Sequence, residues 1–314
     1  MSKVQNLVSV SGGKDSTAMI LLTIEREVKD VAYVFADTGN EHPEVYKYLD
    51  YLESELNIEI IRVKADFTRV MAGKRRFIET KWREHGVDES IIKNALTVLQ
   101  PTGNPFLDLC MWKGRFPSTK AQFCTGELKT NPINSQVVMP MLKEFGKVRS
   151  WQGIRRAESF RRSKQKMHEK LDLNVWAYRP IIEWSAEEVF YLHAKHGIKP
   201  NPLYLQGMNR VGCMPCINCR KDELAEISNR FPEVIDRLRE WEELVSKAAK
   251  QGSSTFFATF NGTSEASKIH YKTHGVDAAV EWSKTMRGGK QFDLFKQGEE
   301  MPSCSSNYGL CDAG

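Results

Sequence analysis

Residues 11–16 form the segment best suited to chemistry, and they read Ser-Gly-Gly-Lys-Asp-Ser. Two adjacent glycines let the backbone turn tightly and present its N–H groups to an anion. The helix predicted to begin here adds the positive end of its dipole, and Lys14 adds a point charge. The segment is not a Walker A loop, because Asp15 stands where that motif requires Ser or Thr. The residues predicted to bind phosphate are Ser11, Gly12, Gly13, Lys14, Asp15 and Ser16.

A second reactive group is a dense cysteine array with the pattern C-x-x-C-x-x-C. Three thiolates at this spacing can converge on one metal centre, and Cys124 is a candidate for the fourth ligand. Four cysteines suit both an iron–sulfur cluster and tetrahedral Zn²⁺, so the residue types leave the metal open. Cys110, in an apolar stretch, is predicted to be packed rather than reactive. The predicted metal ligands are Cys124, Cys213, Cys216 and Cys219.

Further polar residues follow two other predicted strands. Asp37 and Thr38 come directly after an apolar run, at the carboxyl end where open α/β sheets bind ligands. Arg155 and Arg156 follow another strand-like segment, and guanidinium groups suit bidentate phosphate contacts. We therefore predict that these four side chains border the phosphate site. The lysine-rich run at 164–170 is interpreted as a solvated face, with a nucleic-acid groove as the alternative.

Alternating strands and helices must position these groups. Strands are predicted at 7–10, 31–36 and 58–63, with helices at 17–27 and from Pro43 onward. This order indicates an α/β fold with a doubly wound, mostly parallel sheet. Residues 66–123 are interpreted as a helical insertion. The predicted domains are 1–205 and a Cys-rich C-terminal appendage with a tail, 206–314.

Composition excludes several classes of protein. The chain has 314 residues, of which 41% are hydrophobic and 27% charged, as is typical of a globular protein. No apolar run approaches the ~20 residues of a membrane span, and the N-terminus has no signal-peptide pattern, so we expect a cytoplasmic protein without a membrane partner. In a reducing compartment the seven cysteines are thiols or ligands rather than disulfides. The net charge of +5 indicates polyanionic partners only weakly.

Taken together, the motifs resemble those of the PP-loop superfamily, and in particular the phosphoadenylyl-sulfate (PAPS) reductase-like family. Residues 11–16 resemble the SGGxDS pyrophosphate loop, and residues 37–44 resemble the D-T-G-x-x-(F/H)-P-E stretch. Segments that resemble G-x-R-x-x-E-S, R-P…W, N-P-L-Y and G-C-x-P-C follow in the family's order at 151–159, 178–184, 201–204 and 212–216. The resemblance implies an adenine nucleotide alpha-hydrolase-like fold. It also implies nucleotide contacts from the first loop and from Asp37, Thr38, Gly153, Arg155 and Arg156.

The cysteines and the tail depart from the family's reductases. Cluster-containing adenylyl-sulfate reductases use an adjacent Cys pair, whereas Thr125 follows Cys124 here and Cys219 is the substitute ligand. On this comparison we expect a [4Fe–4S] cluster, with Zn²⁺ as the alternative. Tyr308 stands where the E-C-G-L-H motif of sulfonucleotide reductases has its nucleophilic Cys. The candidate catalytic thiols are the flanking Cys304 and Cys311, which could equally be ligands, sulfur carriers or idle thiols.

Residues 124–129, Cys-Thr-x-x-Leu-Lys, resemble the ATP-pyrophosphatase branch, which includes DNA phosphorothioation proteins and phage-encoded proteins. That branch implies attack of an acceptor oxygen on the α-phosphate of ATP, release of pyrophosphate, and an adenylylated acceptor ready for sulfur. Lys14, Asp15 and Asp37 are the predicted catalytic residues, with Mg²⁺ on one of the two carboxylates. The implied partners are an adenine nucleotide, a sulfur donor protein or thiol reductant, and DNA or RNA.

Two alternatives stay open at this point. One is a sulfonucleotide reductase that acts on PAPS or adenylyl sulfate with Cys304 or Cys311 as nucleophile. The other is a non-catalytic, nucleotide-sensing subunit that binds nucleic acid. The leading interpretation is an ATP pyrophosphatase of a sulfur-modification pathway, acting on nucleic acid or another acceptor.

Overall fold

The computed structural model describes residues 4–257, 270–285, 306–308 and 310. A six-stranded sheet in the order β3-β2-β1-β4-β6-β5 forms its centre. All neighbouring strands pair in parallel except β5, which runs antiparallel to β6 at one edge. The strands are β1 (Val4–Val10), β2 (Val31–Asp37), β3 (Ile60–Lys64), β4 (Lys147–Trp151), β5 (His168–Asp172) and β6 (Val175–Tyr178).

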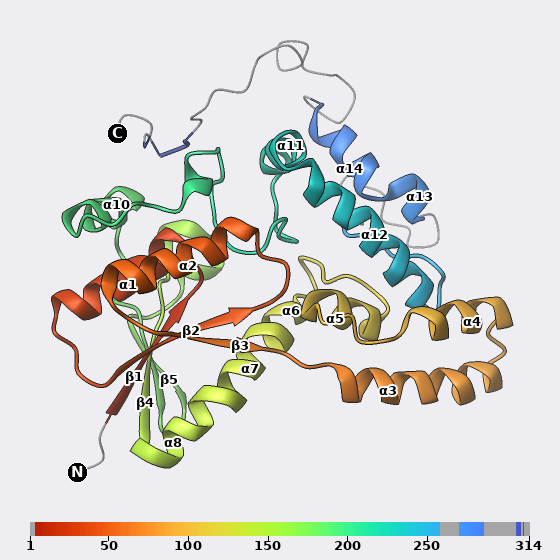
Figure 1. The fold of residues 1–314 in the computed structure, drawn as a ribbon, viewed down its shortest axis with the longest axis horizontal. Helices are drawn as coiled ribbons and strands as arrows, with labels where there is room; N and C mark the ends of the chain where they lie inside the picture. The colour runs from red at the N-terminus through yellow and green to blue at the C-terminus, as the bar shows by residue number, and fades with distance from the viewer. Residues whose placement is uncertain (1–3, 258–269, 286–305, 309, 311–314) are drawn as a thin grey trace.

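Helices cover both faces of this sheet (Figure 1). One face carries α1 (Lys14–Glu25), α2 (Pro43–Leu56) and α10 (Ala186–Lys195), and the other carries α8 (Met139–Phe145). Successive residues of β1 alternate between two hydrophobic clusters, with Leu7 on the α8 side and Val8 on the α1 side. The predicted α/β fold with a doubly wound, mostly parallel sheet is confirmed.

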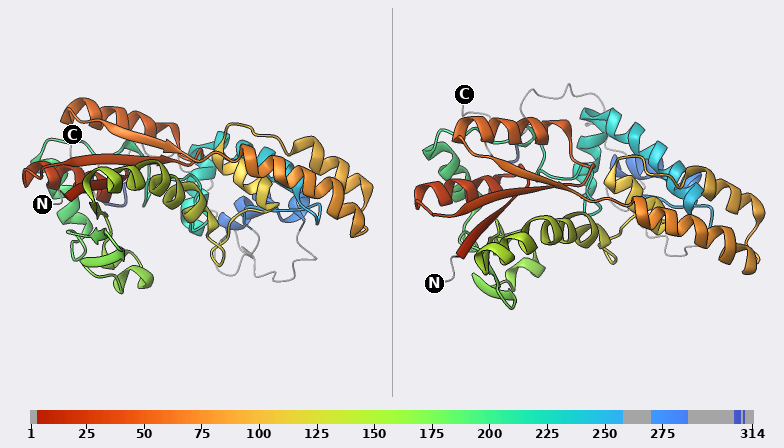
Figure 2. Two further views of the ribbon diagram at one scale, coloured as in Figure 1. Left: turned by 90° about the horizontal axis from the view of Figure 1, so that it is seen from below. Right: turned by 60° about the horizontal axis from the view of Figure 1, so that its bottom comes forward.

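A helical region extends to one side of the sheet. In Figures 1 and 2, α3 and α4 reach away from the strands, and α12 lies alongside them. Its main helices are α3 (Thr68–Phe77), η1 (Ile78–Trp82), α4 (Glu89–Val98), α5 (Pro105–Lys113), α11 (Lys221–Arg230), α12 (Pro232–Ala248), α13 (Tyr271–His274) and α14 (Val276–Ser283). The short helical segments elsewhere are α6 (Phe123–Thr125), η2 (Gly126–Thr130), α7 (Asn131–Ile133), η3 (Asn134–Val138), η4 (Arg156–Glu158), α9 (Phe160–Ser163) and η5 (Pro202–Tyr204). None of the described helices is both long and apolar enough to cross a bilayer.

Local sequence signals explain where several elements begin. α2 starts with Pro43, and the His42 ring accepts a hydrogen bond from the N–H of Glu44. α10 starts after Ser185, whose hydroxyl and the carboxylate of Glu188 form a reciprocal capping box. The sequence does not predict β5, because all five of its residues are exposed and it has no apolar alternation.

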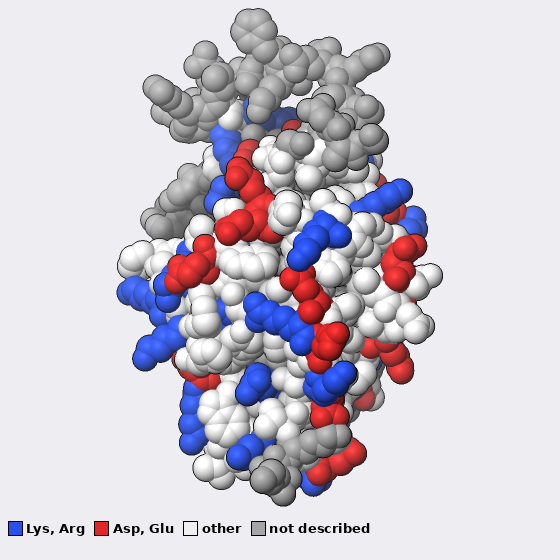
Figure 3. All heavy atoms as spheres, turned by 90° about the vertical axis from the view of Figure 1, so that its left-hand side faces the viewer, with Lys and Arg blue, Asp and Glu red and all other residues white. Residues whose placement is uncertain are grey.

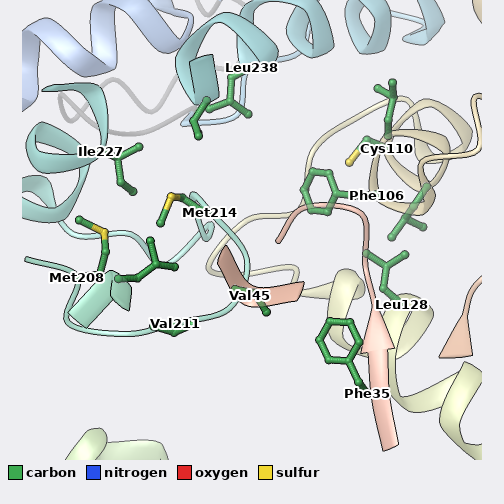
Figure 4. Close-up of a cluster of buried hydrophobic side chains, with 14 of the residues drawn as sticks. Phe35, Val45, Phe106, Cys110, Leu128, Met208, Val211, Met214, Ile227 and Leu238 are labelled. Carbon is green, nitrogen blue, oxygen red and sulfur yellow. The ribbon is translucent and has the colours of Figure 1, made fainter. Parts of the chain in front are cut away.

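One hydrophobic cluster continues from the sheet into the C-terminal helices. Figure 4 shows Phe35 of β2 and Val45 of α2 in the same cluster as Met214 and Leu238 of the C-terminal segment. The position predicted as a domain boundary, near residue 205, therefore does not interrupt this cluster. The division into 1–205 and 206–314 stays a prediction.

Candidate functional site

The predicted phosphate loop lies between the carboxyl end of β1 and the first turn of α1. Gly12 has a φ of +71°, a backbone conformation that favours glycine. Ser16 accepts a hydrogen bond from the N–H of Ser11 at 3.1 Å and donates to the carbonyl of Gly13 at 2.9 Å, so its hydroxyl shapes the loop. Within the described part of the chain, the backbone N–H groups of Gly13, Asp15 and Ser16 have no acceptor. These donors at the positive end of α1 remain for an anion.

Three residues from a distant part of the chain hold this loop. The hydroxyl of Tyr204 accepts a hydrogen bond from the N–H of Lys14 at 2.9 Å, and Asn201 donates to the carbonyl of Gly12 at 3.2 Å. Nε2 of the buried His193 lies 2.9 Å from the carbonyl oxygen of Lys14. Burial lowers the pKa of His193, so the neutral ring donates this hydrogen bond. The shape of the loop thus depends on segments that follow β6.

A chain of charges crosses the start of α1. The ammonium group of Lys14, only 4% exposed, lies 3.0 Å from one oxygen of Asp15. Nε of the buried Arg155 donates to the other oxygen of Asp15 at 2.6 Å. Gly153 permits this approach, since a Cβ there would lie 2.6 Å from the carbonyl oxygen of Asp15. Two cations share one carboxylate here, and the net positive charge suits a phosphate group.

Tyr308 covers the side chain of Lys14. The Lys14 ammonium lies 5.3 Å from the centre of the Tyr308 ring and 5.6 Å from the centre of the Tyr204 ring. The hydroxyl of Tyr308 donates to the carbonyl of Asn209 at 2.7 Å, and Asn307 donates to the carbonyl of Gly207 at 2.7 Å. Tyr308, from the C-terminal end of the chain, therefore packs on the lysine of the phosphate loop.

The loop after β2 begins with Asp37 at the same edge of the sheet. Its Oδ1 accepts hydrogen bonds from the N–H of Gly39 at 2.9 Å and from the hydroxyl of Tyr46 at 2.7 Å. No described residue bonds to its second oxygen. Thr38 is buried and donates to the carboxylate of Glu41 at 2.7 Å, so its hydroxyl is committed within the loop. Asp37 is thus the residue of this pair with a free oxygen for a ligand.

The cysteine loop is held against the loop after β2. The N–H of Met214 donates to the carbonyl of Asn40 at 2.7 Å, and Arg237 donates both to the Asn40 side chain and to the carbonyl of Met214. The Cys213 thiol donates to Glu41 at 3.7 Å. Burial raises the pKa of Cys213 to about 12, so the thiol is protonated in this arrangement.

The predicted metal ligands do not form a metal-binding group in this arrangement. Among the described residues, no three His, Cys, Asp or Glu side chains are placed to hold a metal ion. Cys213 faces Glu41, and the Cys219 thiol donates to the carbonyl of Arg220 at 3.5 Å. This geometry does not fit an iron–sulfur cluster or Zn²⁺. The assignment of ligands to Cys124, Cys213, Cys216 and Cys219 stays a prediction.

Comparison with known proteins places the chain in a family. The model of the phosphoadenosine phosphosulfate reductase domain matches residues 5–219. The chain belongs to this family. A protein of Escherichia phage 186, described as an uncharacterized 37.8 kDa protein in the gpa 5′ region, is 49% identical over 98% of this chain and 96% of its own. The phosphoadenosine 5′-phosphosulfate reductase of Vibrio vulnificus is 24% identical over 71% of each chain.

A solved structure is also similar to this member of the PAPS reductase domain family. The phosphoadenylyl-sulfate reductase of Candida auris, in a phosphate complex, matches with a TM-score of 0.41 at 15% identity. The match covers 69% of this chain and 83% of that one. The resemblance that the sequence motifs predicted is confirmed by the family match.

Family motifs account for only part of the site. Asn201 and Tyr204 belong to the N-P-L-Y segment, but the motif does not reveal that they hold the phosphate loop. No sequence signal points to His193, an isolated histidine on an amphipathic helix. Arg156, predicted to contact the nucleotide, instead pairs with Glu183. The predicted catalytic thiols, Cys304 and Cys311, lie outside the described residues.

Proposed function

We propose that this PAPS reductase-like protein binds ATP with its β- and γ-phosphates at the phosphate loop and cleaves the bond between the α- and β-phosphates. The observation that carries the proposal is the convergence of Lys14, Arg155 and the unpaired N–H groups of Gly13 and Ser16 at the start of α1. Donors placed in advance stabilise the charge that develops on a leaving pyrophosphate.

The proposed reaction is an adenylyl transfer. An oxygen of the acceptor forms a bond to the α-phosphorus, while the bond from that phosphorus to the bridging oxygen breaks. Pyrophosphate leaves with the bonding electrons, and the acceptor releases its proton to solvent. Water as acceptor yields AMP and pyrophosphate. Any other acceptor becomes adenylylated and thus activated toward a sulfur nucleophile.

Asp37 is the better of the two predicted residues for Mg²⁺. Both oxygens of Asp15 are engaged by Lys14 and Arg155, whereas one oxygen of Asp37 has no partner among the described residues. Mg²⁺ is commonly bound by one or two carboxylates together with phosphate oxygens. The ion would neutralise charge on the nucleotide's phosphates, and Asp15 would orient Lys14 and Arg155.

Tyr308 favours ATP cleavage over reduction of a sulfonucleotide. A phenol cannot replace the thiol that attacks sulfur in the family's reductases, and here the phenol packs over Lys14. Reduction remains the second candidate, because the chain is 24% identical to a PAPS reductase. That reaction would require Cys304 or Cys311 as the nucleophile.

Product analysis separates the candidates. Purified, anaerobic protein is incubated separately with ATP and Mg²⁺ and with PAPS and a thiol. We expect pyrophosphate and AMP from ATP, abolished by Lys14→Ala and retained by Lys93→Ala, which alters an exposed lysine of α4. Sulfite from PAPS, lost on Cys304→Ser or Cys311→Ser, would establish the reductase instead. Nucleotide binding without either product would leave a non-catalytic subunit.

Metal analysis tests the cysteine assignment independently. Anaerobically purified protein that contains iron and sulfide in equal amounts supports the [4Fe–4S] prediction. A colourless protein with one zinc ion supports the Zn²⁺ alternative. Protein free of both agrees with the absence of a metal-holding group among the described residues.

A further inference from the structure

The chain that follows β4 forms an exposed projection beside the candidate site. It passes through η4 and α9 into β5, the outermost strand of the sheet, and stands out from the body of the molecule (Figure 2, left, green). All five residues of β5 are exposed. Phe160 of α9 is 79% exposed, and the Lys164 ammonium lies 4.4 Å from its ring centre. An aromatic ring this exposed, with a cation over it, contributes nothing to the core.

Three cations of this projection have no ion-pair partner among the described residues. Arg161, Lys164 and Lys170 are exposed, and none of them makes an ion pair there. Of the neighbouring acids, Glu158 pairs with Arg162, Glu169 pairs with Arg179, and Asp172 accepts a hydrogen bond from the N–H of Leu173. On the face shown in Figure 3, basic and acidic side chains are interspersed. The charges of Arg161, Lys164 and Lys170 therefore remain uncompensated by ion pairs with described residues.

Strand pairing adds residues of the sheet to these exposed cations and the exposed ring of Phe160. Trp176 of β6 is in register with Arg149 of β4 on one side and with Lys170 of β5 on the other. Side chains in register on neighbouring strands lie on the same face. The half-buried indole is thus flanked by two exposed cations. We call the set formed by Arg149, Phe160, Arg161, Lys164, Lys170 and Trp176 the basic edge.

Hydrogen bonds connect the projection to the segment that contributes Arg155 to the candidate nucleotide site. The Arg156 guanidinium donates to the carbonyl of Gln165 at 3.3 Å, which ties the projection to the segment after β4. The backbone N–H of Arg155 donates to Glu158 at 3.0 Å, while the Nε of the same residue donates to Asp15. A polymer that follows the cations from β5 toward α9 would therefore arrive at the edge of the sheet that carries the phosphate loop.

We propose that the basic edge binds single-stranded nucleic acid, with phosphates on Arg149, Arg161 and Lys170 and unpaired bases on Phe160 and Trp176. Separate aromatic faces interleaved with cations suit unstacked bases, whereas a duplex keeps its bases stacked inside. An acidic protein segment would use the charges but leave the exposed rings without a role. The binding of nucleic acid does not depend on the proposed function. Only the further step, in which the bound nucleic acid accepts the adenylyl group, rests on the proposed function.

Fluorescence anisotropy with a labelled single-stranded oligonucleotide, measured without ATP, tests the binding. The variant Arg149→Glu with Lys170→Glu is compared with Lys93→Glu with Lys120→Glu, two exposed lysines outside the basic edge. Two charge reversals change the net charge from +5 to +1 in each variant, so the two variants are matched in net charge and differ in where the charges are reversed. We expect at least about tenfold weaker binding for the first variant alone. If two phosphate contacts are lost, the slope of the logarithm of the binding constant against the logarithm of the salt concentration should be smaller in magnitude by about 1.4.

Aromatic variants probe the base contacts. Phe160→Ala is compared with Tyr191→Ala, which removes another exposed ring, 71% exposed on α10. Weaker binding of the Phe160 variant at an unchanged salt slope supports stacking. Equal binding by both charge variants, or tighter binding of a duplex than of a single strand, overturns the proposal. ATP cleavage with water, measured on the same variants, should be unchanged, so failure here is distinguishable from failure of the proposed reaction.

Discussion

At the scale of single residues, the site depends on one shared carboxylate. Asp15 lies between Lys14 and Arg155, so each cation is fixed by a group that also limits its charge. Fixed cations bind a phosphate with less loss of side-chain freedom than mobile ones. The contact between Arg155 and Asp15 therefore fixes the directions of both side chains.

This arrangement predicts that Arg155→Lys is not conservative. Lysine keeps the charge but loses the planar group that donates Nε to Asp15, so we expect kcat/KM for ATP cleavage to fall by about tenfold to a hundredfold. Steady-state kinetics of pyrophosphate release measure the effect. Arg69→Ala, which alters an exposed arginine of α3, is the control and should leave the kinetics unchanged. A wild-type value for Arg155→Lys would contradict the role assigned to the contact.

Sequence and structure agree on the residues that are close in the chain. The glycines, Lys14 and Asp15 occupy consecutive positions, so their spacing alone predicts an anion site. His193 and Tyr204 act through the fold, because a hydrogen bond over more than 170 positions leaves no local pattern. Arg156 shows the converse, since adjacency to Arg155 suggested a shared ligand, while in the structure Arg155 pairs with Asp15 and Arg156 with Glu183.

At the scale of elements, the turn after β4 is packed directly on the start of α1. A Cβ on Gly153 would lie 2.6 Å from the carbonyl oxygen of Asp15, a backbone atom that cannot move without disturbing the helix. We expect Gly153→Ala to lower the free energy of unfolding by about 1–3 kcal/mol and to weaken nucleotide binding. Urea unfolding and nucleotide titration measure the two effects.

Gly73→Ala is the matched control for this substitution. Gly73 lies inside α3, and nothing would lie within 4 Å of its added Cβ. Alanine there should raise the stability by up to about 1 kcal/mol through helix propensity. If the two variants behaved alike, the close approach at Gly153 would not limit the fold.

The elements differ in how far their sequences predict them. Apolar runs in the mostly buried strands β1 and β2 identify them as strands. In contrast, β5 contributes no residue to the core and is defined only by its pairing with β6. β6 ends at Tyr178, and the backbone turns at Pro180.

At the scale of the whole molecule, one buried carboxylate joins the C-terminal helices. Glu242 of α12, 2% exposed, accepts the N–H of Phe256 at 2.8 Å and the N–H of Val276, the first residue of α14, at 2.8 Å. Burial raises the pKa of Glu242 from 4.5 to about 7. The folded protein therefore retains a proton there that the unfolded chain has released.

This proton predicts the direction of a pH effect. Between about pH 4.5 and 7 the folded state binds more protons at Glu242, so its stabilising contribution is present below pH 4.5 and is lost as the pH rises toward 7. The loss is of the order of 3 kcal/mol at most. Urea unfolding of the wild type and of Glu242→Gln across this range should show a steeper decline for the wild type. Parallel pH profiles would contradict the assignment.

The long-range support of the phosphate loop has a consequence for how the protein is made. The ribosome synthesises Gly12 and Lys14 early, and it adds Asn201 and Tyr204 only some 190 residues later. A nascent chain therefore exposes the loop without its supports during most of its synthesis. The supported loop can form only after residue 204 of the 314 has been synthesised, so a fragment that ends before Asn201 would contain the complete motif and still lack the site.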